Sequence, residues 1–314
     1  MSDEISISFP SVPTTIVGES NMQQQHDSRP ALEAQPHDPS PEESRIKPHF
    51  IFIEPKWSHE TRETLIKAWN RAIARYYPNR EAVSPFTVIE GRLGNIEPAQ
   101  IQCDCMVSPA NSYGIMDGGY DYVLSDVFRQ PKTRDFWHIS NHVQSYLQTQ
   151  YRGYLPPGSC IIVPLPEDVS GPTRFVLDPE GRDQDADGNP GINYGNPWGA
   201  TSMAVLPTMR EPANVEWHQD LVYNCMWTLQ VEIDKWNAAL DDGDQKVIRK
   251  VLMTGLATGC GQVPAEKCAS QMVLSVKHFN EPVLVQPRWS DVGERGQLIE
   301  DTIVGEGNPR TRYG

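Results

Sequence analysis

The sequence predicts an α/β protein with a three-layer α/β/α arrangement around a central mixed sheet. Short apolar runs alternate with longer runs of helical periodicity between residues 49 and 279. Glycine-containing turns follow two of the apolar runs, near residues 118 and 259, as expected where strands lead into helices. The chain has 314 residues, of which 38% are apolar, so it can bury a sizeable core.

The first part of the folded region begins with a short apolar strand at 49–53. A helix is predicted from Trp57 to Tyr77, because Ser58 can cap it and apolar residues recur on one face every three or four positions. Pro78 closes this helix. The elements expected next are strands at 86–89 and 103–107, helices at 121–128 and 136–151, and a strand at 159–163.

The second part continues the alternation after a long loop. Residues 178–200 are rich in Gly, Pro, Asn and Asp, a length that indicates either function or an insertion. Pro264 is suited to the first turn of a helix that runs to about Phe279. The other elements expected here are strands at 174–177, 202–206 and 249–253, and a long helix at 214–240.

The predicted domain spans 47–286, with 178–200 as its insertion loop, and has a tail on each side. Residues 1–46 are rich in Pro, Gln, Ser, Asp and Glu, a composition too polar to offset the entropy of ordering. Residues 287–314 form the C-terminal tail, in which Trp289 and Ile299 are the residues suited to docking.

Charge and cysteine content exclude several classes of function. The net charge of −14 repels phosphodiester backbones, so no nucleic-acid partner is expected. No apolar run reaches the roughly 20 residues of a membrane helix, and no secretory signal is visible. Six scattered cysteines are then expected to be reduced, in the cytoplasm or the nucleus. No cofactor is expected.

The functional hypothesis rests on two polar, glycine-containing loops that follow predicted strands. In the first, a strand ends in Ser108-Pro109-Ala110-Asn111, and the pair Gly118-Gly119 precedes a helix. In the second, Gly255-Leu256-Ala257-Thr258-Gly259-Cys260-Gly261 follows the strand at 249–253. Backbone amides in such turns, together with the start of a helix, favour anionic oxygens. Both loops fall at the carboxyl ends of strands, where α/β proteins bind ligands.

These residues resemble the macrodomain family of ADP-ribose-binding modules. Asp104 and Asn111 match the Asp and the last Asn of the family's first motif, and Gly118, Gly119 and Asp121 match its glycines and the following Asp. The segment 249–264 resembles the second motif, the loop around the diphosphate. The resemblance covers about residues 86–280 and implies a macrodomain-like fold.

The resemblance also implies a role for each matching residue. Asn111 holds the distal ribose, and Asp121 orients the attacking group in hydrolytic members. The ligand-binding residues that it implies are Asn95, Ile96, Asn111, Gly118, Gly119, Tyr120, Thr258, Gly259, Cys260 and Gly261. The implied partner is ADP-ribose or an ADP-ribosylated protein.

Three positions depart from the family pattern. Asn95 stands where many macrodomains have an Asp that accepts from the adenine amino group, and an amide oxygen accepts without charge. Ser108-Pro109 replaces Asn-Ala. Asp117 stands where the first glycine is expected, either as a second acid/base candidate or, as we favour, as an Asp in a left-handed turn.

Other interpretations of the same residues remain open. Asn111 could simply stabilise a turn, and Asp121 could be the N-cap of its helix. Cys260 could be a nucleophile with a lowered pKa, although no His at a motif spacing supports it. The loop residues Asp183, Asp185 and Asp187 copy the start of a calcium loop, but position twelve is Tyr194 rather than Glu, which favours a solvated loop.

The sequence therefore predicts a protein that binds ADP-ribose or a related nucleotide between two glycine loops. As an enzyme, it would hydrolyse an ADP-ribosyl bond or an ADP-ribose phosphoester such as the 1″-phosphate, with Asn111, Asp121 and less strongly Asp117 as catalytic residues. The alternatives are a non-catalytic reader of ADP-ribose and a degenerate scaffold. Asp117 and Asn95 favour these alternatives.

Overall fold

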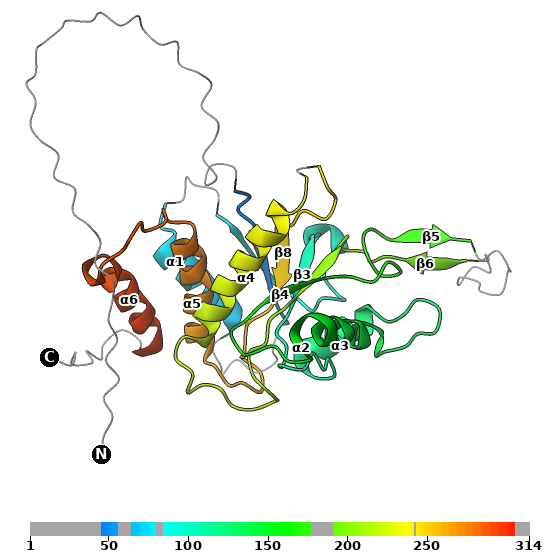
Figure 1. Ribbon diagram of the computed structural model, residues 1–314, viewed down its shortest axis with the longest axis horizontal. Coiled ribbons are helices and arrows are strands. Elements are labelled where there is room, and N and C mark those ends of the chain that lie inside the picture. The colour runs from blue at the N-terminus through cyan, green and yellow to red at the C-terminus, as the bar shows by residue number, and fades with distance from the viewer. Residues whose placement is uncertain (1–44, 56–63, 80–83, 178–190, 242, 305–314) are drawn as a thin grey trace, which may run out of the picture. The chain divides into compact units, whose positions relative to one another are not determined.

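Six strands form the central sheet of the computed structural model, which describes residues 45–55, 64–79, 84–177, 191–241 and 243–304 (Figure 1). All of these residues belong to the unit Arg45–Gly314. The strands are β1 (His49–Glu54), β2 (Phe86–Glu90), β3 (Cys105–Ser108), β4 (Ile161–Pro164), β7 (Ser202–Val205) and β8 (Lys250–Met253).

The strand order is β2-β1-β8-β3-β7-β4. Neighbouring strands run parallel except for β4, which is antiparallel to β7. The sheet is therefore mixed, as the sequence predicts. Parallel neighbours require crossovers, and each one here contains at least one helix.

Helices cover both faces of the sheet (Figure 1). One face packs against α1 (Leu65–Tyr76), α4 (Leu221–Ala238) and α5 (Ala265–Phe279), and the other against α2 (Gly119–Val127) and α3 (His138–Tyr151). This arrangement confirms the three-layer α/β/α prediction. Alternate residues of one strand serve opposite layers, so Phe50 and Phe52 face α5 while Ile51 and Ile53 belong to the core under α2 and α3.

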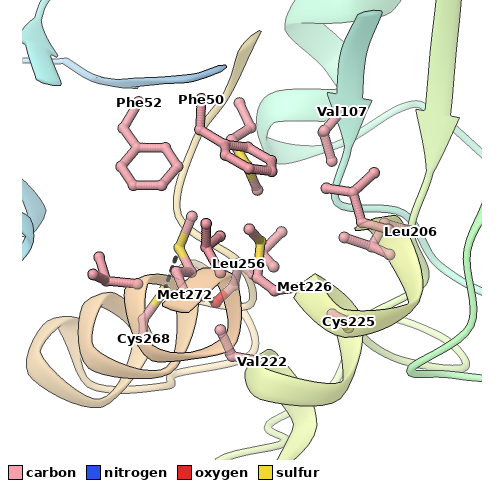
Figure 2. Close-up of a cluster of buried hydrophobic side chains, with 14 of the residues drawn as sticks. Phe50, Phe52, Val107, Leu206, Val222, Cys225, Met226, Leu256, Cys268 and Met272 are labelled. Atoms are coloured by element: carbon pink, nitrogen blue, oxygen red, sulfur yellow. Dashed lines mark hydrogen bonds between the residues drawn. The ribbon is translucent and has the colours of Figure 1, made fainter. Parts of the chain in front are cut away.

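Aromatic and sulfur-containing side chains fill the core between the sheet and the helices α1, α4 and α5 (Figure 2). Phe52 is fully buried, and its ring centroid lies 4.9 Å from that of Trp69 on α1 and 5.3 Å from that of Phe86 on β2. The indole Nε1 of Trp69 donates to Met272 Sδ on α5 at 3.5 Å. This core fixes α1 and α5 against β1, and with α5 the glycine loop that precedes it.

Asp104 ties three strands together at the amino edge of the sheet. Its Oδ2 accepts hydrogen bonds from the amides of Arg249 at 2.8 Å and Lys250 at 2.7 Å, and its carbonyl accepts from Ser202 N. The carboxyl ends of the parallel strands lie at the opposite edge. Asp104, which the macrodomain resemblance aligns with a motif residue, therefore holds β8 and β7 to β3 and does not face a ligand at the carboxyl edge.

We expect Asp104→Ala to lower the free energy of unfolding by about 2 kcal/mol, because two backbone amides lose a charged acceptor. Asp104→Asn, which keeps one oxygen in place, should cost less than half as much. Urea denaturation of both variants and the parent measures the difference. Equal stability of the alanine variant and the parent would show that water replaces the carboxylate at no cost.

Several boundaries differ from the sequence prediction. Thr64 caps α1 by accepting from Lys67 N. Ser58, the cap expected from the sequence, lies outside the described residues. The helix expected at 214–240 begins only at Leu221. Residues 214–220 bond elsewhere instead: Val215 N donates to Gly261 O, and the buried Lys267 donates to the carbonyls of Glu216 and His218.

The segments expected to be a tail and an insertion also contain structure. Residues 289–304 form α6 (Trp289–Val304), which is held to α5 by a hydrogen bond from Gln271 Nε2 to Thr302 Oγ1. Ile299 packs on the core, whereas Trp289 is exposed. In the insertion, β6 (Ile192–Tyr194) pairs antiparallel with β5 (Arg174–Val176) in a hairpin that extends from the sheet (Figure 1).

Arg45, which the sequence places in the N-terminal tail, is also bonded to the domain. Its guanidinium donates to the Phe279 carbonyl, to Asn280 and to Asp234, at 2.8–3.4 Å. Residues 1–44 lie outside the described residues.

Candidate functional site

The two glycine loops lie side by side at the carboxyl edge of the sheet. They follow β3 and β8, which are hydrogen-bonded neighbours. Met209, in the connection after β7, contacts both loops. It forms a β-bridge with Asn111, and its Sδ lies 3.5 Å from the Sγ of Cys260. The structure thus brings together the two motifs, which are about 140 residues apart in the sequence.

The side chain of Asn111 organises the first loop. Its Oδ1 accepts from the amides of Tyr113 at 3.0 Å and Ile115 at 3.3 Å, and its Nδ2 donates to the Ile115 carbonyl at 2.7 Å. Asn111 therefore has the turn-stabilising role that the sequence left open. Only the second hydrogen on Nδ2 remains available to donate to a ribose hydroxyl.

The start of α2 presents unbonded backbone amides. Among the described residues, the amides of residues 117–121 have no hydrogen-bond acceptor. Gly118 is the N-cap with an extended φ of −142°, and Gly119 has the left-handed φ of +58°. A Cβ added to either glycine would have no heavy atom within 4 Å. The loop thus leaves open space above a row of donors at a helix N-terminus.

Asp121 is the buried carboxyl of this site. It lies in the first turn of α2 and is 6% exposed, and its Oδ1 accepts from Ser108 Oγ at 2.7 Å. Because Gly118 is the N-cap, the N-cap interpretation of Asp121 is wrong. Burial raises the pKa of Asp121 to about 7, the Ser108 hydroxyl opposes this rise, and the charge of Asp117 adds to it.

Asp117 is exposed and adopts no left-handed conformation, so the left-handed turn favoured from sequence is not observed. Only Gly119 of the 117–119 segment has a positive φ. Tyr120 packs against the core under α2 and α3, and its buried hydroxyl has no hydrogen-bond partner among the described residues. Burial raises the pKa of Tyr120 far above its ordinary value.

The second glycine loop, residues 255–261, also presents unbonded backbone amides, and its backbone is strained at one residue. Ala257, although not a glycine, has a φ of +57°, a conformation that costs free energy and is often found at functional sites. Among the described residues, the amides of 258–261 have no acceptor. Gly255 and Gly261 are required for packing, because a Cβ at either would lie about 2.5 Å from a neighbouring atom. Gly259 has open space above it, and Thr258 is half-buried beside it.

Cys260 is the one exposed cysteine, and all six cysteines are free. No hydrogen bond joins its Sγ to a His side chain among the described residues, and its neighbour is the Sδ of Met209. The structure gives the nucleophile interpretation no partner base among the described residues.

A hollow of about 450 Å³ lies at the end of β2. It is lined by Ile89, Glu90, Gly91, Arg92, Asn95, Ile96, Glu97 and Gln100. Asn95 and Ile96, which the sequence assigns to the ligand, are thus at a cavity, while Asn111 and the two glycine loops do not line it. A Cβ at Gly91 would come within 2.5 Å of Ile96, so this glycine maintains the turn around the hollow.

Sequence reasoning missed three features of this edge. Ser108 was treated only as a departure from a motif, although it bonds Asp121. Lys267 was not considered, although it supports the segment beside the second loop. Tyr113 and Tyr154 form an exposed edge-to-face pair with ring centroids 5.6 Å apart. A polar residue at the end of an apolar strand was the available signal for Ser108.

Among the described residues, no group of His, Cys, Asp or Glu side chains is arranged to hold a metal ion. The calcium candidates Asp183, Asp185 and Asp187 lie outside the described residues. No described helix is both long enough and apolar enough to cross a lipid bilayer.

In comparisons with protein-family models and with curated proteins, no family model and no curated protein matches this chain. The macrodomain resemblance rests on the residues of the two motifs.

Proposed function

We propose that this protein binds ADP-ribose or a closely related nucleotide at the carboxyl edge of its sheet. One observation carries the proposal: two rows of unbonded amides, at 117–121 and 258–261, follow adjacent parallel strands. Backbone amides of this kind bind the oxygens of a diphosphate. Several of them can approach the same phosphate group because no side chain stands in between.

The helix dipoles support an anionic ligand in a chain of net charge −14. The helices α1, α2, α4 and α5 follow β1, β3, β7 and β8, which are all parallel, so their N-termini lie toward the same edge. Each N-terminus carries a partial positive charge. The local field at this edge is therefore more favourable to phosphate than the net charge suggests.

The hollow beside Asn95 supports a nucleotide rather than a simple phosphate. The hollow lies at the end of β2. The first glycine loop follows β3, which is three strands away from β2 in the sheet order. At a strand spacing of about 4.8 Å, the two are roughly 14 Å apart. An extended ligand with a base at one end and a ribose at the other, joined by a diphosphate, suits this span. The Asn95 amide offers the base a donor and an acceptor.

Hydrolysis of an ADP-ribosyl bond or phosphoester is the second proposal, and one observation favours it. A buried carboxyl with a pKa near 7 is suited to acid/base chemistry at neutral pH, and Asp121 has that pKa. Two observations favour a non-catalytic reader instead. The Asn111 amide is engaged by its own loop, and Asp117 brings a second carboxylate to the site.

Glycine substitutions test the binding proposal. At Gly118 and Gly259 a side chain meets no protein atom within 4 Å, and neither residue has a positive φ. We expect Gly118→Val and Gly259→Val to change stability by no more than about 0.5 kcal/mol. Both should weaken ADP-ribose binding at least tenfold, about 1.4 kcal/mol, in calorimetric titration, because the new side chain occupies the ligand's position.

Gly243→Val is the matched control, since Gly243 is equally open and lies in the connection between α4 and β8. It should bind like the parent. Unchanged affinity in both site variants would remove the proposed ligand position, and no binding by the parent at millimolar ADP-ribose would leave the scaffold alternative. Incubation with ADP-ribose 1″-phosphate and with ADP-ribosylated protein then separates enzyme from reader.

A further inference from the structure

Ser108 and Asp121 form a buried pair directly beneath the amide row at the start of α2. Ser108 is fully buried at the last position of β3, and Asp121 is 6% exposed in the first turn of the helix that follows. Their 2.7 Å hydrogen bond joins the sheet to the helix N-terminus. The other carboxyl oxygen, Oδ2, has no partner among the described residues. The pair is thus fixed at one oxygen and unengaged at the other.

An anion on the amides of 117–121 would lie close to this carboxyl, since the Asp121 amide is itself one of the row. Two negative charges a few ångströms apart in a dehydrated site repel each other strongly. A neutral carboxylic acid has no such repulsion, and its O–H can donate a hydrogen bond to the anion. The geometry therefore favours the protonated form of Asp121 whenever an anion is bound.

Resting on the proposed function, we propose that Ser108 is a positioning residue that holds Asp121 as a proton-carrying group, so that ligand binding takes up a proton from solvent. The chemistry is a protonation alone: the carboxylate gains a proton on Oδ2 and becomes a carboxylic acid, while Oδ1 stays bonded to the Ser108 hydroxyl. Binding is consequently coupled to pH around neutrality.

The charges around Asp121 are consistent with this role. On the loop before α2, Asp117 raises the pKa of Asp121, and on β3 Ser108 is uncharged. On α2 itself, Tyr120 lies nearby and is neutral at physiological pH. On α3, His138 bonds Asp168 and His142 bonds the Pro164 carbonyl, so both imidazoles are engaged elsewhere. No cation is among the groups that shift the pKa of Asp121.

The test is calorimetric titration of the full chain with ADP-ribose in two buffers of different ionisation enthalpy. At pH 7 the two apparent enthalpies should differ by an amount equal to uptake of about half a proton per site. The dissociation constant should rise about tenfold per pH unit above pH 7. Asp121→Asn should bind at pH 8 with no dependence on buffer, because its amide cannot take up a proton.

Ser108 variants separate positioning from a merely structural role. In Ser108→Ala the carboxylate loses its hydrogen bond, so the loss of affinity should begin at a higher pH than in the parent. Ser108→Thr keeps the hydroxyl and should restore the parent pH profile. A Ser108→Ala profile that is lower at every pH but unshifted would contradict positioning, and a poorly folded alanine variant leaves the asparagine variant as the deciding measurement.

The outcomes distinguish this inference from the proposed function. ADP-ribose binding without proton uptake overturns the inference and leaves the proposed function standing. Binding of inorganic pyrophosphate but not ADP-ribose overturns the proposed function, and the buffer comparison then tests proton uptake with pyrophosphate. No heat with either probe overturns both.

Discussion

Asp121→Asn is expected to stabilise the protein at pH 8 by up to about 4 kcal/mol relative to the parent. The pKa of Asp121 rises from an ordinary value of 3.8 to about 7, and each unit corresponds to about 1.4 kcal/mol. A carboxyl whose pKa is higher in the folded state gives stability that is complete below the unfolded-state pKa. That stability is lost as the pH rises through the folded-state pKa. The neutral amide loses nothing over this range.

The pH dependence is the distinctive part of this prediction. The advantage of the asparagine variant should be near its minimum at pH 4, should grow by about 1.4 kcal/mol per pH unit, and should level off above pH 7. Urea denaturation of both proteins at pH 4, 5, 6, 7 and 8 measures it. A difference that stays constant over this range would mean that Asp121 is ionised in the folded protein.

Asp126→Asn is the control for the loss of a carboxylate from the same helix. Asp126 is exposed and pairs with Arg129 at 2.9 Å. A surface ion pair of this kind contributes no more than about 1 kcal/mol, so the substitution should have only a small effect on the free energy of unfolding.

Phe52→Ala is expected to lower the free energy of unfolding by about 3–5 kcal/mol. The ring is fully buried between the sheet and the helices (Figure 2), in contact with Trp69 and Phe86. Removing it leaves a cavity that the surrounding strands and helices cannot close, and the aromatic contacts are lost as well. Guanidinium or urea denaturation of the variant measures the loss.

Two further substitutions test whether the loss of stability depends on the buried volume that is removed. Phe52→Leu retains most of the buried volume and should cost considerably less than Phe52→Ala. Phe175→Ala removes the same side chain from β5, where Phe175 is 44% exposed, and should cost much less than Phe52→Ala. Similar losses for Phe52→Ala and Phe175→Ala would place Phe52 outside the main core.

Much of the architecture could be predicted because it depends on local pattern. Alternating strand and helix periods indicated the three layers, and the motifs placed both loops after strands. The local sequence pattern does not show which distant groups compete for the backbone hydrogen bonds of a predicted helix. The sequence predicts a helix over 214–240, yet Val215 N donates to Gly261 O and Lys267 holds the carbonyl of Glu216, so the helix starts only at Leu221.

The candidate site shows the same division. The sequence identified the loop at Asn111 and Asp121, but two alternatives for each residue remained because both depended on hydrogen-bond partners. The loop conformation decided that the Asn111 side chain bonds residues 113 and 115. Packing of α2 on β3 decided that Asp121 is buried against Ser108 rather than exposed as an N-cap.

The sequence by itself determined the alternation of strands and helices between residues 49 and 279 and the positions of the two glycine loops, because strand and helix periods and glycine turns are properties of neighbouring residues. Only the tertiary structure decided that these loops lie on adjacent strands, with their amides unbonded, and that one carboxyl beneath them has a pKa near 7. The physical reason is that burial and charge depend on all the atoms around a group, most of which are remote in the chain.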